Sequence, residues 1–173
     1  MTMQFTISAD DSKKARHPHD IFLLNLILNH ILIFVAILSA SSLAKYVVVV
    51  PIISVLSMIY IFIGAARAKT KASWYVNGHW QLCAKRSRIF LTMILIVTAI
   101  FIILFLVSGG DLKPQHWALG GAAFFPAMVT VFALIIMESE GLHHAKLGKL
   151  PDWVKEKFPD GAYEPLPEEA QQE

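Results

Sequence analysis

Charged residues are absent from four long stretches of this sequence, so all 28 Lys, Arg, Asp and Glu residues lie outside them. Of the 173 residues, 16% are charged and 55% are hydrophobic, and the mean hydropathy is +0.55. Ordinary soluble domains carry about 25% charged residues, and a helix of about 20 residues crosses the hydrocarbon core of a bilayer. The charge-free stretches therefore predict an integral membrane protein. They are residues 21–44, 46–66, 89–107 and 117–137.

The sequence also lacks the alternation of polar and apolar residues that is typical of membrane β-strands. Lipid offers no partner to backbone N–H and C=O groups, whereas a helix satisfies these groups within itself. The connections around Lys45 and over residues 108–116 are short, which favours antiparallel packing of consecutive helices. We therefore expect an all-α fold in which residues 21–137 form four transmembrane helices, arranged as two antiparallel hairpins.

Cysteine occurs once, at Cys83, so an intrachain disulfide is excluded. The sequence also has no Walker loop, no dinucleotide glycine fingerprint, no Gly-x-Ser-x-Gly elbow and no His-Glu-x-x-His motif. We therefore assign no catalytic residue. Nucleic acid is not an expected partner, because membrane topology already accounts for the basic residues.

Basic residues are distributed unequally around the four stretches. Thirteen of the fifteen precede the first stretch, separate the second from the third, or follow the fourth, whereas the other two are Lys45 and Lys113. Because Lys and Arg accumulate in cytoplasmic loops, both termini are predicted to be cytoplasmic. We expect an integral, multi-pass protein of the bacterial inner (plasma) membrane. A cleavable signal peptide is a less favoured interpretation of residues 21–44, because its apolar region would be shorter.

Segments outside the apolar stretches complete the predicted organisation. Residues 1–20 form a cytoplasmic N-terminal segment. Residues 67–88 form a cytoplasmic loop, whose Trp, Tyr and Arg side chains lie along the lipid headgroups. Residues 138–158 form a juxtamembrane segment that contains a short helix over residues 153–158. Residues 159–173 are acidic and rich in proline, which predicts a disordered tail.

One face of the first predicted helix carries amide and small side chains. Asn25, Asn29, Leu32, Ala36 and Ala40 follow one another at spacings of three or four residues, so they share this face. Helices associate in lipid through close packing of small residues and through interhelical hydrogen bonds. This face is therefore expected to pack against another helix of the chain or of a partner.

A polar layer is predicted near the middle of the membrane. His30, Ser57, Thr98 and Pro126 each lie about nine to eleven residues into their stretches, roughly 14 to 17 Å deep. Pro126 cannot donate to the carbonyl of Ala122, so His30 or a hydroxyl group could donate to that carbonyl. The layer has two interpretations. It is either a hydrogen bond that locks the helices together or a site coupled to a proton or a substrate, as in transporters with broken helices.

Candidate metal ligands follow the fourth stretch. Glu140, His143 and His144 have the i, i+3 and i+4 spacing by which a carboxylate and imidazoles share a transition metal, iron (Fe) or zinc (Zn), on one continuing helix. Gly141 argues for a break in that helix, and Gly148 provides a second stop. One helix supplies too few ligands, so further ones would have to converge beneath the membrane domain. The candidates are His17, His19, Asp20 and His79.

These observations lead to three functional hypotheses. The first is a non-enzymatic accessory or scaffold subunit of a membrane complex, whose partners are lipid and either other membrane helices or further copies of the same chain. The second is a small oligomeric transporter or channel that uses the layer around His30. The third is a metalloenzyme at the cytoplasmic face that uses Glu140, His143 and His144. No cofactor is predicted under the first hypothesis.

Overall fold

The computed structural model describes residues 2–40, 42, 46, 48–111 and 113–158, and these are almost entirely helical. Four of its helical segments are long and apolar enough to cross a membrane, which confirms the predicted number of apolar helices in the described part of the chain. The acidic tail over residues 159–173 lies outside the described residues. The elements in chain order are β1 (Thr2–Gln4), α1 (Ala9–Leu24), the π-helix η1 (Asn25–Ile33), α2 (Phe34–Ser39), α3 (Val49–Lys71), α4 (Trp74–Val107), α5 (Pro114–Leu147), β2 (Lys149–Pro151) and α6 (Asp152–Lys157).

The helices extend beyond the apolar stretches at one end, and this corrects the predicted loop over residues 67–88. Helix α3 continues to Lys71 and α4 begins at Trp74, so only a short turn separates them. Two aromatic side chains of this region are buried within the protein, contrary to the prediction that they lie on its surface. Tyr75 is fully buried, and Trp74 is 7% exposed. The segment is helical because its side chains pack against the rest of the chain. Local composition does not reveal this packing.

Helix α5 also continues past its apolar stretch, and the predicted break at Gly141 is wrong. The helix runs through Gly141 and ends at Leu147, where Gly148 adopts φ 73°. A Cβ at Gly148 would meet the carbonyl oxygen of Phe5 at 2.2 Å. Glycine is therefore required at this helix end both for its left-handed conformation and for the close approach of the N-terminal segment.

A small antiparallel sheet joins the N-terminal region to the segment after α5, which the sequence did not predict. Met3 pairs with Leu150, and the N–H of Phe5 donates to the carbonyl of Gly148 over 2.8 Å. The short helix α6 follows, one residue earlier than predicted. We call the end of the molecule that carries β1, β2 and α6 the basal end. The end that carries the connection between α4 and α5 is the distal end.

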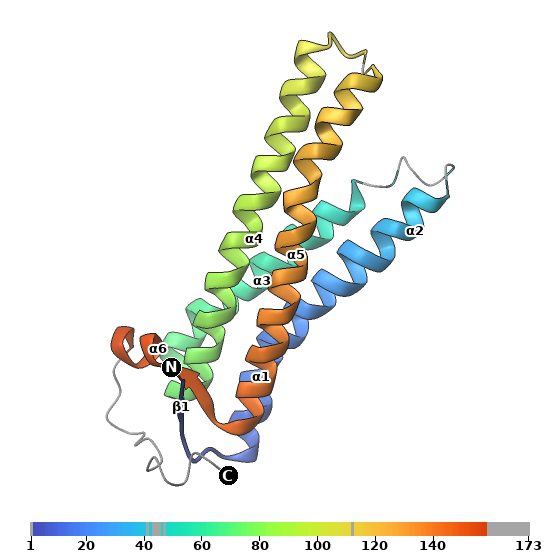
Figure 1. The fold of residues 1–173 in the computed structure, drawn as a ribbon. Helices are drawn as coiled ribbons and strands as arrows, with labels where there is room; N and C mark the ends of the chain where they lie inside the picture. Colours follow the sequence, from blue (N-terminus) through green and yellow to red (C-terminus); the bar gives the residue numbers. More distant parts are fainter. Residues whose placement is uncertain (1, 41, 43–45, 47, 112, 159–173) are drawn as a thin grey trace.

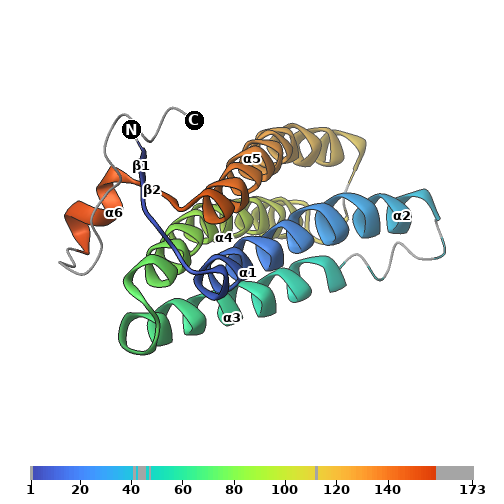
Figure 2. The ribbon, with the colours of Figure 1, turned by 90° about the horizontal axis from the view of Figure 1, so that it is seen from below.

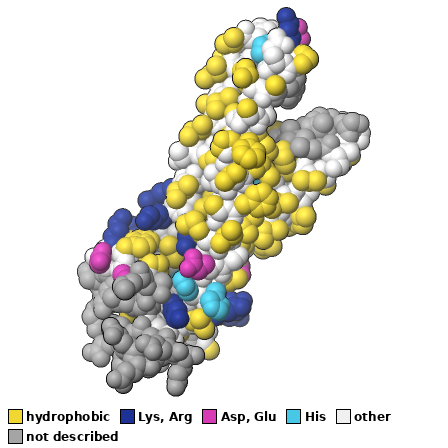
Figure 3. All heavy atoms as spheres, viewed as in Figure 1, with side chains coloured by type: hydrophobic (Ala, Val, Ile, Leu, Met, Phe, Trp, Pro, Cys, Tyr) yellow, Lys and Arg dark blue, Asp and Glu magenta, His cyan; other side chains and the backbone are white. Residues whose placement is uncertain are grey.

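The arrangement of the helices differs between these two ends. At the basal end α1 packs against both α4 and α5. Toward the distal end α4 and α5 stay side by side, whereas α2 and α3 turn away from them (Figures 1 and 2). On the face seen in Figure 3, hydrophobic side chains cover the middle of the molecule, and most of the Lys and Arg side chains gather near the basal end. The molecule is thus closed at its base and splayed distally.

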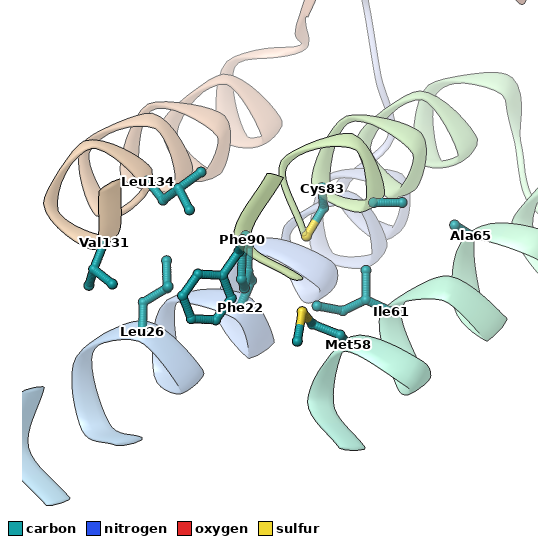
Figure 4. Packing of buried hydrophobic residues seen from close by; sticks show 10 residues of the cluster. Phe22, Leu26, Met58, Ile61, Ala65, Cys83, Phe90, Val131 and Leu134 are labelled. Carbon is teal, nitrogen blue, oxygen red and sulfur yellow. The ribbon is translucent and has the colours of Figure 1, made fainter. Parts of the chain in front are cut away.

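Two apolar clusters form the core, and both lie in the basal part of the helices. The first cluster joins α1, η1, α3, α4 and α5 (Figure 4). The second joins the N-terminal segment, the start of α4, the end of α5, β2 and α6. Members of the first cluster are Phe22, Leu26, Met58, Ile61, Ala65, Cys83, Ala84, Phe90, Val131 and Leu134; members of the second are Phe5, Ala15, Trp74, Tyr75, Val76, Ala145, Leu150 and Val154.

Candidate functional site

Five polar or ionisable side chains from three helices meet in the buried basal part of the molecule. We call them the basal polar cluster: His19 on α1, His79, Cys83 and Arg86 on α4, and Glu138 on α5. His19, His79, Cys83 and Glu138 are fully buried, and Arg86 is 7% exposed. Ionisable side chains are rarely buried to this extent unless they are paired, so this cluster is the principal candidate site.

Glu138 is the centre of the cluster's electrostatics. Its Oε2 lies 2.5 Å from Nδ1 of His19, and Nη1 of Arg86 donates to its Oε1 over 3.3 Å. Arg86 also donates to the carbonyl of Met137 over 2.7 Å. One carboxylate thus joins α1 and α4 to α5. Because an ionised carboxylate only accepts hydrogen bonds, Nδ1 of His19 donates to it.

The two histidines of the cluster are hydrogen-bonded to each other. Nε2 of His19 lies 3.0 Å from Nδ1 of His79, so one of these nitrogens carries hydrogen and the other accepts. The rings are nearly perpendicular, with centroids 5.2 Å apart. Glu138, His19 and His79 therefore form a continuous hydrogen-bonded chain from α5 through α1 to α4.

Cys83 brings a potential metal ligand to the same place. A nitrogen of His19, Sγ of Cys83 and a carboxylate oxygen of Glu138 all lie within 4.8 Å of one another. The thiol of Cys83 donates to the carbonyl of Pro18 over 3.3 Å. In Figure 4, the side chain of Cys83 extends from α4 into the interior.

Close helix packing makes this convergence possible. A Cβ at Gly141 would meet Cε1 of His19 at 2.7 Å and Nη1 of Arg86 at 2.8 Å. Any larger residue at this position of α5 would therefore push into the cluster. The glycine that suggested a helix break instead lets three helices approach one another.

A second buried polar group lies along η1, where two residues of the predicted packing face are used within the chain. Nδ2 of Asn29 donates to the carbonyl of Val50 over 2.9 Å and to Oγ of Ser54 over 3.0 Å. Ser54 in turn donates to Oδ1 of Asn25 over 3.0 Å. Both amide side chains point to α3, and together they lock η1 to that helix. Their segment is a π-helix, a form that is frequent at functional sites.

His30 belongs to this second group. Its Nε2 pairs with Oγ of Ser54, and its ring packs edge-on against Phe90 with centroids 4.9 Å apart. The serine beside His30 is thus Ser54, one turn before the predicted Ser57, which is half-buried. The contacts of His30 are with α3 and α4.

The other members of the predicted midplane layer lie elsewhere. Thr98 and Pro126 are both exposed. Pro126 lines a groove of about 620 Å³ between α4 and α5, together with Met93, Ala123 and Ala127. The carbonyl of Pro126 accepts a hydrogen bond from Thr130 over 2.9 Å. The structure therefore does not bring His30, Thr98 and Pro126 together.

The small residues of the packing face have surroundings different from those of its amides. Ala36 on α2 is exposed, and Ala40 is half-buried just after that helix ends. Leu32 is 56% exposed. The face therefore divides into a polar half that α3 covers and a small-residue half that protrudes distally.

Glu140, His143 and His144 do not belong to a group of ligand-type side chains that could hold a metal ion within the described part of the chain. Nε2 of His144 lies 3.8 Å from Oε1 of Glu140, whose side chain is 59% exposed. Of the described His, Cys, Asp and Glu side chains, the group close enough to hold an ion consists of His19, Cys83 and Glu138. Of the further candidates, His19 and His79 converge, whereas His17 pairs with the hydroxyl of Tyr60 over 3.0 Å.

Sequence reasoning did not assign Cys83, Arg86 and Glu138 to a site, although one signal was present. His79, Cys83 and Arg86 are spaced four and three residues apart, which places them on one face if their segment is helical. Treating residues 67–88 as a loop removed that signal.

Comparison of the chain with protein-family models, curated proteins and solved structures found no match.

Proposed function

We propose that the chain is a multi-pass protein of the bacterial inner membrane whose basal end faces the cytoplasm. The distribution of Lys and Arg residues supports this orientation. The pairing of β1 with β2 is consistent with it, since the pairing holds the two end regions of the chain on one side. The two antiparallel hairpins, α1 to α3 and α4 to α5, follow from this orientation.

We further propose that the protein is a non-enzymatic accessory or scaffold subunit. The observation that carries this proposal is the divided packing face of the first membrane helix. Asn25 and Asn29 form hydrogen bonds with Ser54 of α3, whereas the small side chain of Ala36 is exposed. Small residues let partner helices approach closely in lipid, and a chain that uses only half of such a face leaves the other half for a partner.

The long distal helices offer further surface to lipid or to partner helices. In the most apolar window of α4 only 6% of the residues are buried by the rest of the chain. Leu95, Ile102 and Phe105 are each more than half exposed. Such side chains suit lipid contact, so they are compatible with the subunit proposal without identifying a partner.

The test is affinity purification of the tagged protein from its native membrane in mild detergent, followed by mass spectrometry. We expect a stoichiometric partner that is lost from Ala36→Ile, because the larger side chain blocks close approach. Val35→Leu is the matched control, since Val35 is also exposed, at 52%, and already large. The proposal is contradicted if the wild-type protein purifies without any stoichiometric partner, or if both variants retain it equally.

The transport hypothesis rests on the group around His30 and predicts the opposite pattern. His30→Leu should then abolish function while Ala36→Ile leaves it intact. The contacts of His30 favour a locking role, because its Nε2 pairs with a serine that is already bonded to both asparagines. We therefore expect His30→Leu to retain the partner.

A further inference from the structure

We infer that His19, Cys83 and Glu138 bind a transition-metal ion, with Zn²⁺ as the best chemical match, and that this ion clamps α1, α4 and α5 together at the basal end. This site is separate from Glu140, His143 and His144, and it does not depend on the subunit proposal. The inference begins from the donor set: one imidazole nitrogen, one sulfur and one carboxylate oxygen, all within 4.8 Å of one another.

The chemistry of these donors selects the class of ion. Thiolate and imidazole are ligands for zinc and related first-row metals, whereas Mg²⁺ and Ca²⁺ prefer oxygen ligands. Zinc binds sulfur at about 2.3 Å and nitrogen at about 2.0–2.1 Å. Nδ1 of His19 and Oε2 of Glu138 are hydrogen-bonded at 2.5 Å in this structure, so they would move apart to become ligands of one ion. One thiolate and one carboxylate neutralise its charge, and three protein ligands leave a fourth position for water.

The surrounding residues provide the support that a metal centre needs. Metal-bound histidines usually donate their second ring nitrogen to a neighbour, which fixes the ring. If Nδ1 of His19 binds the ion, Nε2 is free to donate to Nδ1 of His79, which already lies 3.0 Å away. Arg86 holds the other carboxylate oxygen, Oε1 of Glu138, so Oε2 is directed toward His19 and the ion.

Binding also requires removal of one proton. Sγ of Cys83 donates to the carbonyl of Pro18, so the thiol carries hydrogen in this arrangement. On binding, the sulfur–hydrogen bond is replaced by a sulfur–metal bond and that proton leaves to solvent, with no change of oxidation state. The hydrogen that Nδ1 of His19 donates to Glu138 moves to Nε2 of the same ring, and the hydrogen of His79 moves from Nδ1 to Nε2, so one proton is lost in total.

The test uses the full-length, tag-free protein, purified in detergent without chelators. Elemental analysis should find about one zinc or other first-row metal ion per chain. Protein produced with Co²⁺ in the medium should show the near-ultraviolet absorption of a cobalt–thiolate bond. This readout needs no variant, and Cys83 is the sole cysteine, so the band assigns the ligand directly.

Variants sharpen the assignment. Cys83→Ser should abolish the cobalt–thiolate band and weaken zinc binding by at least about 100-fold, and His79→Gln should weaken binding by about 10- to 100-fold while retaining the band. The matched control is His143→Gln combined with His144→Gln, which should leave metal content and band unchanged. Circular dichroism and gel filtration report whether each variant is folded. The inference is overturned if wild-type protein holds no metal, shows no cobalt–thiolate band, or loses its metal in the His143/His144 variant.

Discussion

The helices are held together differently in the basal and distal halves of this molecule. At the base, apolar clusters, a two-stranded sheet and a buried ionic cluster join every long helix to another. Toward the distal end, α2 and α3 turn away from α4 and α5, and large apolar side chains are exposed along all of them (Figure 1). The difference implies that the contacts that determine the chain's own fold are concentrated at the base, whereas the chain itself leaves much of the distal surface exposed.

The largest effect should come from removing the central carboxylate of the base. Glu138→Ala leaves Arg86 and His19 buried without their partner, and breaking a buried charge pair costs about 3–5 kcal/mol. Unfolding of the purified protein in mixed detergent and SDS, followed by circular dichroism, measures this loss. Glu140→Ala is the control, since its exposed contact with His144 should contribute at most about 1 kcal/mol. Equal effects of the two variants would show that the cluster does not hold the base together.

A pair of glycines on α5 tests the same contrast without removing a charge. Gly141→Ala places a methyl group against His19 and Arg86, so we expect a loss of about 1–3 kcal/mol from overpacking. Gly121→Ala meets nothing within 4 Å and should stabilise the helix by up to about 1 kcal/mol. The same unfolding assay gives the sign for each variant. A stabilising Gly141→Ala would mean that the three helices are not in close contact.

The locking role of η1 should have a smaller effect. Asn29→Leu removes the hydrogen bonds to Val50 and Ser54, and interhelical hydrogen bonds in membranes contribute about 0.6 kcal/mol on average and up to about 1.7. Thr98→Val is the control, because Thr98 is exposed and should change the free energy of unfolding by less than about 0.5 kcal/mol. If Asn29→Leu has no larger effect than Thr98→Val, the group around η1 does not lock these helices.

The smallest effect on stability is expected at Ala36. Ala36→Ile adds volume at an exposed distal position and should change the free energy of unfolding by less than about 0.5 kcal/mol. Ala145→Ile makes the same change at a fully buried basal position and should cost about 1–3 kcal/mol. Any loss of a partner from Ala36→Ile would then reflect the surface and not the fold. A destabilising Ala36→Ile would mean that the distal face is covered by the chain itself.

The same contrast explains which features the sequence could predict. The four apolar helices were predictable, because membrane thickness sets their length and the cost of buried charge excludes ionisable residues from them. The stop at Gly148 was predictable from local chemistry for a similar reason. These features depend on the solvent and on local backbone conformation, and a short segment of the sequence is enough to indicate both.

The basal site was not predictable in the same way. Tyr75 and Trp74 suit an interface or a core equally well, and only the positions of α5, β2 and α6 decide between them. Glu138 directly follows an apolar run, so its position in the sequence is typical of a solvated helix end. In the structure, α1 places His19 against it. Gly141 suggested a helix break because His19, the side chain that requires a glycine there, lies more than one hundred residues earlier in the sequence. These contacts join residues that are far apart in the sequence, so no short segment of the sequence indicates them.

The accessibility of Cys83 tests most directly whether the base is a packed interior. Native membranes would be treated with a membrane-permeant maleimide before and after denaturation in SDS, and labelling would be measured by mass spectrometry. Because Cys83 is the sole cysteine and fully buried, we expect no labelling of the native protein and complete labelling after denaturation. Lys71→Cys adds an exposed thiol at the same end and should be labelled once per chain in the native state. Rapid labelling of Cys83 in native membranes would contradict the account, because it would place residues 67–88 in an open loop.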